Sequence, residues 1–264
     1  MGLKVSSVLV RLAAAAALVL AAAPPGWAQA ATAAMDDEWH FAVVPYFWFA
    51  GISGTVTVKG LVEVPIDKSF SDVISDFDIG LLGHFEGRKN RWGFAFDTLY
   101  LNLGAPVAAD APVVGRLGIS ADVRTFMQEG LAFYRVAYGG RKENPSHLDL
   151  LAGARYFGTS ARLENDVAET GKQTLNWVDA LVGLRFRVPL GSRVRLIGRG
   201  DVAGFGSKFT WSLEGDLAVT LSERWAIGAG WRHLDIDYDK GEGSDRKVFG
   251  VAFDGPRTWV AYAW

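Results

Sequence analysis

Residues 177–188 read WVDALVGLRFRV, and this stretch decides the fold. Apolar side chains occupy every second position from Val178 to Val188, and Asp179, Arg185 and Arg187 lie between them. Side chains two apart share one face of a β-strand, so this strand has an apolar face and a charged face. The same alternation recurs at residues 77–87 and 209–219. The sequence therefore predicts an all-β chain whose strands separate two different surroundings.

Short polar turns alternate with longer segments between the predicted strands. This is typical of an up-and-down meander, and bacterial outer-membrane barrels have an even strand number with short periplasmic turns. We expect a closed antiparallel transmembrane β-barrel of about ten strands, with eight or twelve as alternatives. The approximate strand ranges are 38–50, 77–87, 92–103, 122–138, 147–158, 174–188, 193–205, 209–221, 225–238 and 247–264.

Two prolines fall in the strands that must meet to close the ring. Pro45 lies in the first predicted strand and Pro256 in the last. Because proline has no backbone N–H to donate, each should mark a bulge or a bend. Residues 55–64 could form an external hairpin within the first long loop.

The N-terminus has the features of a secretory signal peptide. Lys4 and Arg11 precede an apolar stretch at 12–23 that prolines then interrupt, and Ala28-Gln29-Ala30 offers a small-residue cleavage site. A membrane-spanning anchor would need about 20 apolar residues. We predict a cleaved signal peptide at 1–30, a periplasmic segment at 31–37 and an outer-membrane barrel at 38–264.

The composition excludes several classes of protein. The 264 residues include no cysteine, which removes disulfide frameworks, thiolate zinc sites and thiol nucleophiles. A formal net charge of −2 does not suggest the basic surface that nucleic acids require. We expect no cofactor.

Two features favour a barrel in lipid over a soluble sandwich, which remains the alternative. First, aromatic residues near the strand ends predict two girdles at the membrane interfaces. The girdle residues are Trp39, Trp92, Tyr138, Trp211, Trp225, Trp231 and Tyr262. Second, the opposite face carries too many charges for a packed core. This lumenal set comprises Asp97, Glu129, Arg135, Asp149, Arg155, Asp179, Arg185, Arg187, Arg195, Arg199, Asp201, Glu214, Asp216, Arg232 and Arg257.

The last strand ends the chain on an aromatic residue. In the tail at 258–264, large side chains alternate, and Tyr262 and Trp264 resemble the C-terminal signal that the barrel assembly machinery reads. Such an ending is unusual for a soluble domain.

Several ordered segments carry a resemblance to a known family. They are 176–179 (NWVD), 182–185 (VGLR), 199–206 (RGDVAGFG), 222–225 (SERW) and 230–238 (GWRHLDIDY), with 70–74, 83–86 and 91–93 in the N-terminal half. Together they resemble a widespread, poorly characterised family of Gram-negative outer-membrane β-barrel proteins. The chain departs from that pattern at Trp264, where phenylalanine is commoner, and at His233, where tyrosine is usual. The resemblance implies location and architecture and supplies no catalytic residue.

The lumenal charges suggest a role. A barrel of about ten strands is only slightly wider inside than its side chains can fill. Charges there must pair or be solvated, because a lone buried charge is costly. We therefore expect a largely plugged lumen and a structural or interaction role, with lipids, lipopolysaccharide and the barrel assembly machinery as partners.

A narrow, porin-like channel for small solutes or ions is an alternative role. Arg185, Arg187, Arg195 and Arg199 would then favour small anions. The discriminating feature is whether these arginines have carboxylate partners across the lumen. The carboxylates placed to supply some are Asp179, Asp201, Glu214 and Asp216.

Catalysis is a further alternative, since barrels of this size include omptin-type proteases and lipid A hydrolases. Those activities need a histidine close to a carboxylate or a serine. His233 falls on the apolar, outward face, and the lumenal pair His84 and Glu86 is the other candidate. We expect no enzyme. Acidic clusters at 72–78 and 235–239 lack the spacing of an EF-hand, and we expect no metal site.

Overall fold

The computed structural model describes residues 37–58, 62–69, 71, 77–106, 120–141, 144–165 and 168–264. The predicted signal peptide lies outside these residues and stays a prediction. No helix in the described part is long and apolar enough to cross a membrane. The elements are β1 (His40–Trp48), β2 (Gly51–Val58), β3 (Val62–Lys68), β4 (Phe77–Lys89), β5 (Trp92–Pro106), β6 (Ser120–Arg141), β7 (Asn144–Asn165), β8 (Ala168–Pro189), β9 (Val194–Gly204), β10 (Phe209–Thr220), β11 (Trp225–Lys240), the 3₁₀ turn η2 (Gly243–Asp245) and β12 (Lys247–Ala263).

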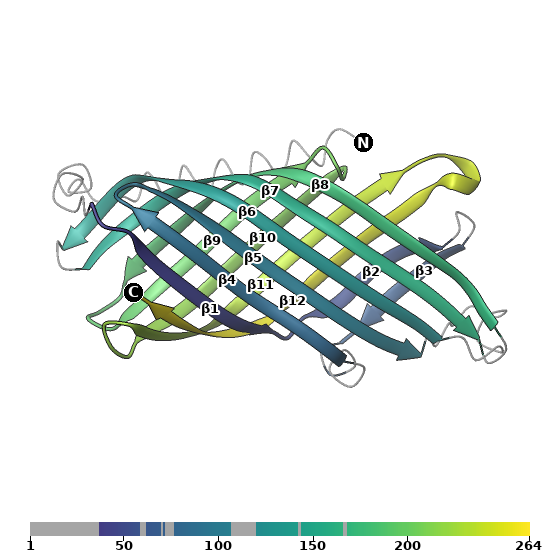
Figure 1. Cartoon of the computed structure of the whole chain (residues 1–264), viewed down its shortest axis with the longest axis horizontal. Coiled ribbons are helices and arrows are strands. Elements are labelled where there is room, and N and C mark those ends of the chain that lie inside the picture. The colour runs from purple at the N-terminus through teal and green to yellow at the C-terminus, as the bar shows by residue number, and fades with distance from the viewer. Residues whose placement is uncertain are drawn as a thin grey trace.

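Ten strands close a ring (Figure 1). Strands β4 to β12 pair antiparallel in chain order, and β1 pairs with β4 on one side and β12 on the other. At this seam the N–H of Phe41 donates to the Trp264 carbonyl at 2.9 Å, and the N–H of Trp264 donates to the Phe41 carbonyl at 3.0 Å. The predicted up-and-down barrel is therefore confirmed.

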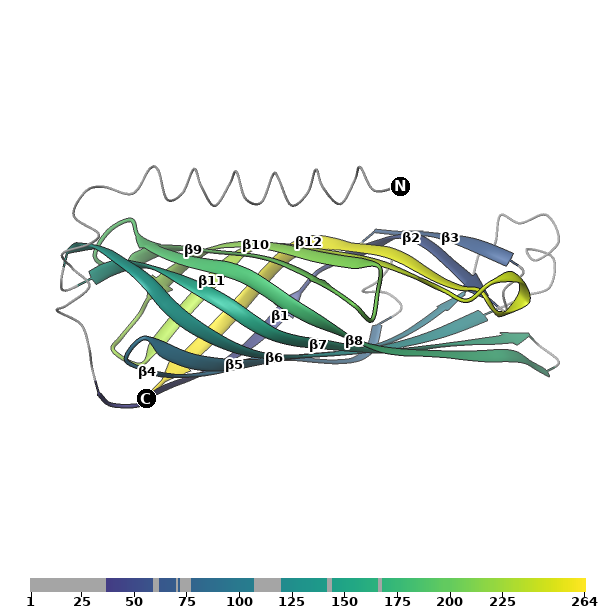
Figure 2. The ribbon, with the colours of Figure 1, turned by 90° about the horizontal axis from the view of Figure 1, so that it is seen from above.

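The two ends of the barrel differ (Figures 1 and 2). At one end, which we call the turn end, lie the C-terminus and the short connections β4–β5, β6–β7, β8–β9 and β10–β11. The opposite end, the loop end, carries the β2–β3 hairpin and the β11–β12 connection. The alternation of short and long connections follows from the antiparallel order.

Pro45 marks a division of the wall at the seam, whereas the pairing of β11 with β12 runs through Pro256 without a register shift, so the bulge expected at Pro256 is absent there. The pairs between β1 and β4 end with Pro45 opposite Gly83. Beyond Pro45 the chain stays beside β12, where the N–H of Phe49 donates to the Pro256 carbonyl at 2.9 Å. The same register continues into β2, and β3 pairs back onto β2 as a hairpin. Thus β1 and β2 both pair with β12, whereas the pairing of β1 with β4 ends at Pro45.

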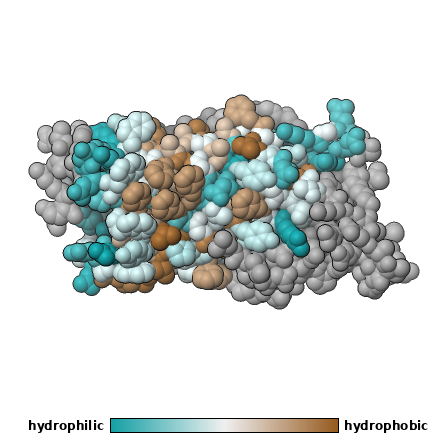
Figure 3. Space-filling view, in the orientation of Figure 1, coloured by the Kyte–Doolittle hydropathy of each residue, from teal (hydrophilic) through white to brown (hydrophobic). Residues whose placement is uncertain are grey.

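Side chains alternate between a buried lumenal face and an exposed outer face. Apolar residues on the outer face stay exposed, including Val178 at 54%, Val182 at 58% and Leu213 at 54%. Figure 3 shows apolar side chains spread over the outer surface next to the hydrophilic turn end. Arg155 and Arg232 are fully buried instead. A soluble sandwich would bury the apolar face, so that alternative is wrong.

One predicted girdle residue lies on the other face. Tyr138 is only 2% exposed and packs inside, with the Arg135 guanidinium 5.4 Å from its ring centroid. The pairing of β6 with β7 shifts by a bulge between Arg135 and Ala137. One extra residue reverses the alternation that follows it. Tyr138 is therefore not part of the aromatic girdle.

The interior changes from charged to apolar along the barrel axis. Towards the loop end, the Trp177 ring centroid lies 4.9 Å from that of Phe157 and 4.5 Å from that of Tyr238. These rings belong to a buried cluster, the apolar cluster, whose other members are Tyr46, Trp48, Ala50, Leu99, Met127, Leu175, Leu234, Ile236, Phe249, Val251 and Phe253. The predicted charged set therefore fills only part of the lumen, and the apolar cluster fills another part.

Candidate functional site: the charged lumen

The predicted lumenal charges do point inward, and period two explains why. Between bulges, residues of one parity in each strand face the lumen, so charged positions from the eight strands β5 to β12 converge there. All of the predicted set are buried except Arg187, Arg195 and Arg257, which are partly exposed.

Arg155 forms the centre of the network. Its Nε donates to Glu129 at 2.7 Å, and its Nη2 donates to Asp201 at 2.7 Å. Arg199 contacts the same two carboxylates, at 2.6 Å and 2.8 Å. Two guanidinium groups and two carboxylates thus alternate across β6, β7 and β9. Charge-assisted hydrogen bonds of this length are among the stronger polar contacts in proteins.

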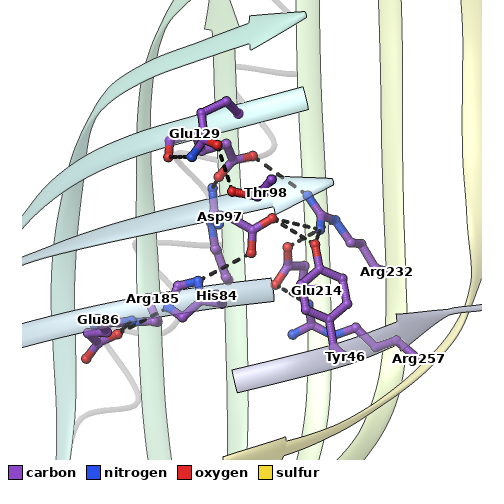
Figure 4. Close-up of polar contacts among 12 residues, drawn as sticks. Tyr46, His84, Glu86, Asp97, Thr98, Glu129, Arg185, Glu214, Arg232 and Arg257 are labelled. Carbon is purple, nitrogen blue, oxygen red and sulfur yellow. Dashed lines mark hydrogen bonds and ion pairs between the residues drawn. The ribbon is translucent and has the colours of Figure 1, made fainter. Parts of the chain in front are cut away.

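A second group surrounds Arg232 on β11 (Figure 4). The Tyr46 hydroxyl donates to Asp97 at 2.8 Å, and Arg232 Nη1 donates to the Tyr46 oxygen at 3.3 Å. Arg232 also pairs with Glu214 at 3.2 Å, and its guanidinium lies 4.8 Å from the centroid of the Trp48 ring. Arg232 therefore joins the charged part of the lumen to the apolar cluster.

A third group lies towards the turn end. Asp149 accepts from Arg135 at 2.8 Å and from Arg185 at 2.9 Å. Arg185 also donates to Glu86, and its guanidinium lies 4.5 Å from the Phe133 ring centroid. Glu86 was outside the predicted set, although its parity in β4 placed it in the lumen beside His84.

A fourth group lies around Arg257 on β12, which reaches two carboxylates of β10. Its Nε donates to Asp216 at 2.9 Å, and its Nη1 pairs with Glu214 at 2.9 Å. Glu214 therefore pairs with Arg232 and Arg257, and Asp216 pairs with Arg257. The sequence predicts these carboxylates as partners of arginines on β8 and β9, and that prediction is wrong. Of the four carboxylates that we placed there, Asp201 is the one that pairs with an arginine of those strands, Arg199.

Asp179 is buried but has a different role. It accepts hydrogen bonds from the Ser207 N–H at 2.6 Å, the Ser207 hydroxyl at 2.8 Å and the Trp177 indole at 3.1 Å. No arginine within the described residues pairs with it. The prediction that Asp179 belongs to the charge network is therefore wrong. Asp179 anchors the β9–β10 connection through Ser207.

His84 lies between two carboxylates of the network (Figure 4). Its Nδ1 is 3.3 Å from Asp97, and its Nε2 is 3.6 Å from Glu86. His233 is elsewhere, on the outer face, where Asp254 accepts from its Nδ1 at 2.9 Å and from the Trp231 indole at 3.0 Å. The described residues contain no group of three or more His, Asp or Glu side chains that could hold a metal ion.

A cavity of about 400 Å³ lies between the network and the turn end. Its lining includes His84, Glu86 and the arginines 185, 187, 195 and 199, together with residues 222–225 of the β10–β11 turn. Arg187 reaches Glu86 at 3.5 Å. Arg195 has no hydrogen bond or ion pair with any described residue.

The other predicted girdle residues lie on the outer face in two groups. Near the turn end, Trp92 packs on Tyr134 with ring centroids 4.7 Å apart, and Trp225 packs on Tyr262 at 4.8 Å. Trp39 and Trp264 are close to the same end and exposed. Further along the axis, Trp211 stacks on His233 at 4.5 Å, beside the exposed Trp231.

The apolar cluster has a signal in the sequence of β11. Past the second aromatic group, the same positions still face inward, but apolar and polar residues exchange faces. Leu234, Ile236 and Tyr238 face inward, while Asp235 and Asp237 face outward. A strand that leaves lipid for water would be expected to exchange its faces in this way.

The fold is shared with outer-membrane barrels of Gram-negative bacteria. The outer membrane protease OmpT from Escherichia coli matches with a TM-score of 0.55 and 9% identity, covering 89% of this chain and 100% of that chain. The translocator domain of autotransporter NalP from Neisseria meningitidis matches with a TM-score of 0.41 and 13% identity, over 87% of this chain and 90% of that chain. Ail, the attachment invasion locus protein of Yersinia pestis, matches with a TM-score of 0.38 and 12% identity, over 87% of this chain and 100% of that chain. No family model and no curated protein matches the sequence.

The match to OmpT, together with the closed ring of ten strands, shows that the chain has the fold of an outer-membrane β-barrel protein. Identities of this size establish the fold alone, and the activity of the OmpT protease does not transfer with it.

Proposed function

We propose that this protein is an outer-membrane barrel whose lumen its own side chains plug and whose role is structural or interactive. The observation that carries the proposal is the network around Arg155, which is fully buried between Glu129 and Asp201. A charged group without water must have such partners, because burying it alone would cost several kcal/mol. The network supports a lumen filled by ion pairs from wall to wall.

The apolar cluster supports the same proposal independently. Trp177, Phe157 and Tyr238 stack across the loop end, on the far side of the network from the cavity. Ions crossing the barrel would have to lose their water in this cluster, whose described members are all apolar or aromatic. The plug therefore has two layers of different chemistry.

A narrow channel for small anions is the second candidate. It is supported by Arg187 and Arg195, whose guanidinium groups line the cavity with weak pairing or none in the described part. Conduction would require both layers of the plug to rearrange. We therefore rank the channel below the plugged barrel.

We further propose that the barrel is not an enzyme. His84 contacts two carboxylates that arginines already engage, and His233 faces outward beside Asp254. We expect lipids and lipopolysaccharide as its surroundings, export through the N-terminal signal peptide, and insertion by the barrel assembly machinery through Tyr262 and Trp264.

Conductance across planar bilayers tests the proposal most directly. We expect the refolded protein to insert without steady channels at moderate voltage. As a matched comparison, Trp177→Ala and Arg155→Ala together should open both layers and raise the conductance. Steady, anion-selective channels from the unmodified protein would support the second candidate instead. Assays of peptide cleavage and of lipid A hydrolysis test the enzyme alternative.

A further inference from the structure

Arg187 and Arg195, near the turn end, lack the close carboxylate partners that the other lumenal arginines have among the described residues. Arg185 and Arg199 are each held by two carboxylates. Arg187, by contrast, has one ion pair, at 3.5 Å, with the same Glu86 oxygen that Arg185 contacts more closely. The Nε of Arg187 is buried and has no hydrogen-bond partner within the described residues. Arg195 has no polar partner among those residues.

The other charged groups near the two arginines are engaged elsewhere or lie apart from them. Asp216 on β10 also lines the cavity, diagonal to Arg195, but it pairs with Arg257. His147 lies opposite Arg187 on β7, and both of its ring nitrogens are buried without a partner in the described part. Ala218 lies opposite Arg195 on β10. Glu223 is near the cavity mouth in the β10–β11 turn, where it is exposed to solvent. The β8–β9 wall of the cavity therefore has an excess of positive charge.

The two arginines are placed to act together. Arg187 is opposite Ile197, and Arg195 precedes Ile197 by two residues on the same inward face. Diagonal neighbours of this kind lie about 7–8 Å apart at Cα, which long side chains bridge easily. A guanidinium group presents several donors in one plane, suited to an acceptor with two or three oxygens.

We propose that the cavity binds a small oxyanion, a phosphate or carboxylate group, between Arg187 and Arg195. Partly buried guanidinium groups favour a nearby counter-ion when their pairing is weak, as at Arg187, or absent among the described residues, as at Arg195. The cavity of about 400 Å³ leaves room for such a group and for a small body attached to it. The site does not depend on whether the lumen conducts, because its residues lie on the turn-end side of the plug.

The mouth of the cavity suggests two sources for the anion. Trp225 lines the cavity and is also 48% exposed as a member of the aromatic girdle. Girdle residues lie at the level of lipid headgroups. A headgroup phosphate at the rim and a free anion in solution would therefore present the same chemistry to Arg187 and Arg195.

Titration of inorganic phosphate by calorimetry tests the site. The full refolded barrel is held in neutral maltoside micelles, which contain no phosphate. We expect saturable binding that Arg195→Gln weakens about ten- to hundredfold, the loss of a charge-assisted hydrogen bond. Arg193→Gln is the matched control, because Arg193 is exposed in the β8–β9 turn and does not line the cavity. Since Arg195 has no partner in the described part, its variant should melt like the unmodified protein without phosphate.

Two outcomes would overturn the proposal: no saturable binding at tens of millimolar phosphate, or equal weakening by Arg193→Gln and Arg195→Gln. Reconstitution into phosphatidylglycerol discs then separates the sources. A headgroup in the site should lower the phosphate affinity of the Arg193→Gln control about tenfold relative to micelles and leave Arg195→Gln little changed. Unchanged affinity of the control would assign the site to a free anion, and both results support the site itself.

Discussion

Arg155 Nε lies 2.7 Å from Glu129, and its Nη2 lies 2.7 Å from Asp201, with the whole side chain buried. The arginine comes from β7, whereas the two carboxylates come from β6 and β9. The three side chains therefore tie together walls of the barrel that a single hairpin would not connect.

Replacing Arg155 with glutamine should lower the free energy of unfolding by about 3–5 kcal/mol, because Glu129 and Asp201 would remain buried without that cation. Urea unfolding of the barrel in lipid vesicles measures the effect. The double variant Arg155→Gln and Glu129→Gln should recover part of the loss, since it removes a charge of each sign. A loss below about 1 kcal/mol for the single variant would mean that water already fills this part of the lumen.

Leu184→Arg should destabilise the barrel in lipid by about 2–4 kcal/mol, because Leu184 is on the outer face of β8 in the middle of the apolar band. Leu190→Arg is the matched control. Leu190 is 60% exposed in the short turn that follows β8, outside that band. Unfolding in vesicles should distinguish the two variants clearly. Equal losses would contradict the assignment of the outer face to lipid.

Much of the fold could be predicted because side chains in a β-strand alternate between two faces, so one assigned residue assigns its neighbours. Val178 and Val182 are outward and Arg185 is inward, as their parity requires. Tyr138 could not be placed by that rule, because the bulge at Arg135–Ala137 adds a residue without an evident marker in the sequence. Parity is reliable only between bulges.

Membership of the charged lumen could also be predicted, but the partners could not. Arg155 stands opposite Asp179 in the β7–β8 register, yet it pairs with Asp201, one strand further around the ring. Which carboxylate a long side chain reaches depends on barrel curvature and on competing donors. Asp179 instead accepts hydrogen bonds from Ser207, whose position depends on how the β9–β10 connection folds.

Asp179→Ala should loosen the β9–β10 connection and leave most of the barrel intact. The carboxylate accepts the Ser207 N–H and hydroxyl, and a hydrogen bond to a charged group contributes about 1.5–3 kcal/mol. Hydrogen exchange at the Ser207 amide should accelerate about ten- to hundredfold, with little change at β6 and β7. Uniform acceleration over the whole barrel would show that Asp179 supports the lumen as well.

Asp239 offers a test of pH dependence at the loop end, beyond the second aromatic group. Hydrogen bonds from Arg246, at 3.0 Å and 3.1 Å, and from Lys208 hold the pKa of Asp239 below its usual value. A carboxyl whose pKa is lower in the folded state stabilises that state above its unfolded pKa, near 3.9, and loses this effect as pH falls through the folded value. The contacts between the β9–β10 and β11–β12 connections should therefore persist at pH 4 and weaken only in stronger acid.

The Asp239 carboxyl signal in an NMR titration measures this directly, and its midpoint should lie below 3.9. Asp239→Asn should make both connections more sensitive to protease at neutral pH without changing the melting temperature of the barrel, because the group is near solvent and such pairs contribute little to global stability. Asp237→Asn is the matched control, two residues earlier on the same outer face of β11. A midpoint at or above 3.9, or equal sensitivity of the two variants, would show that Arg246 and Lys208 do not hold the connections through Asp239.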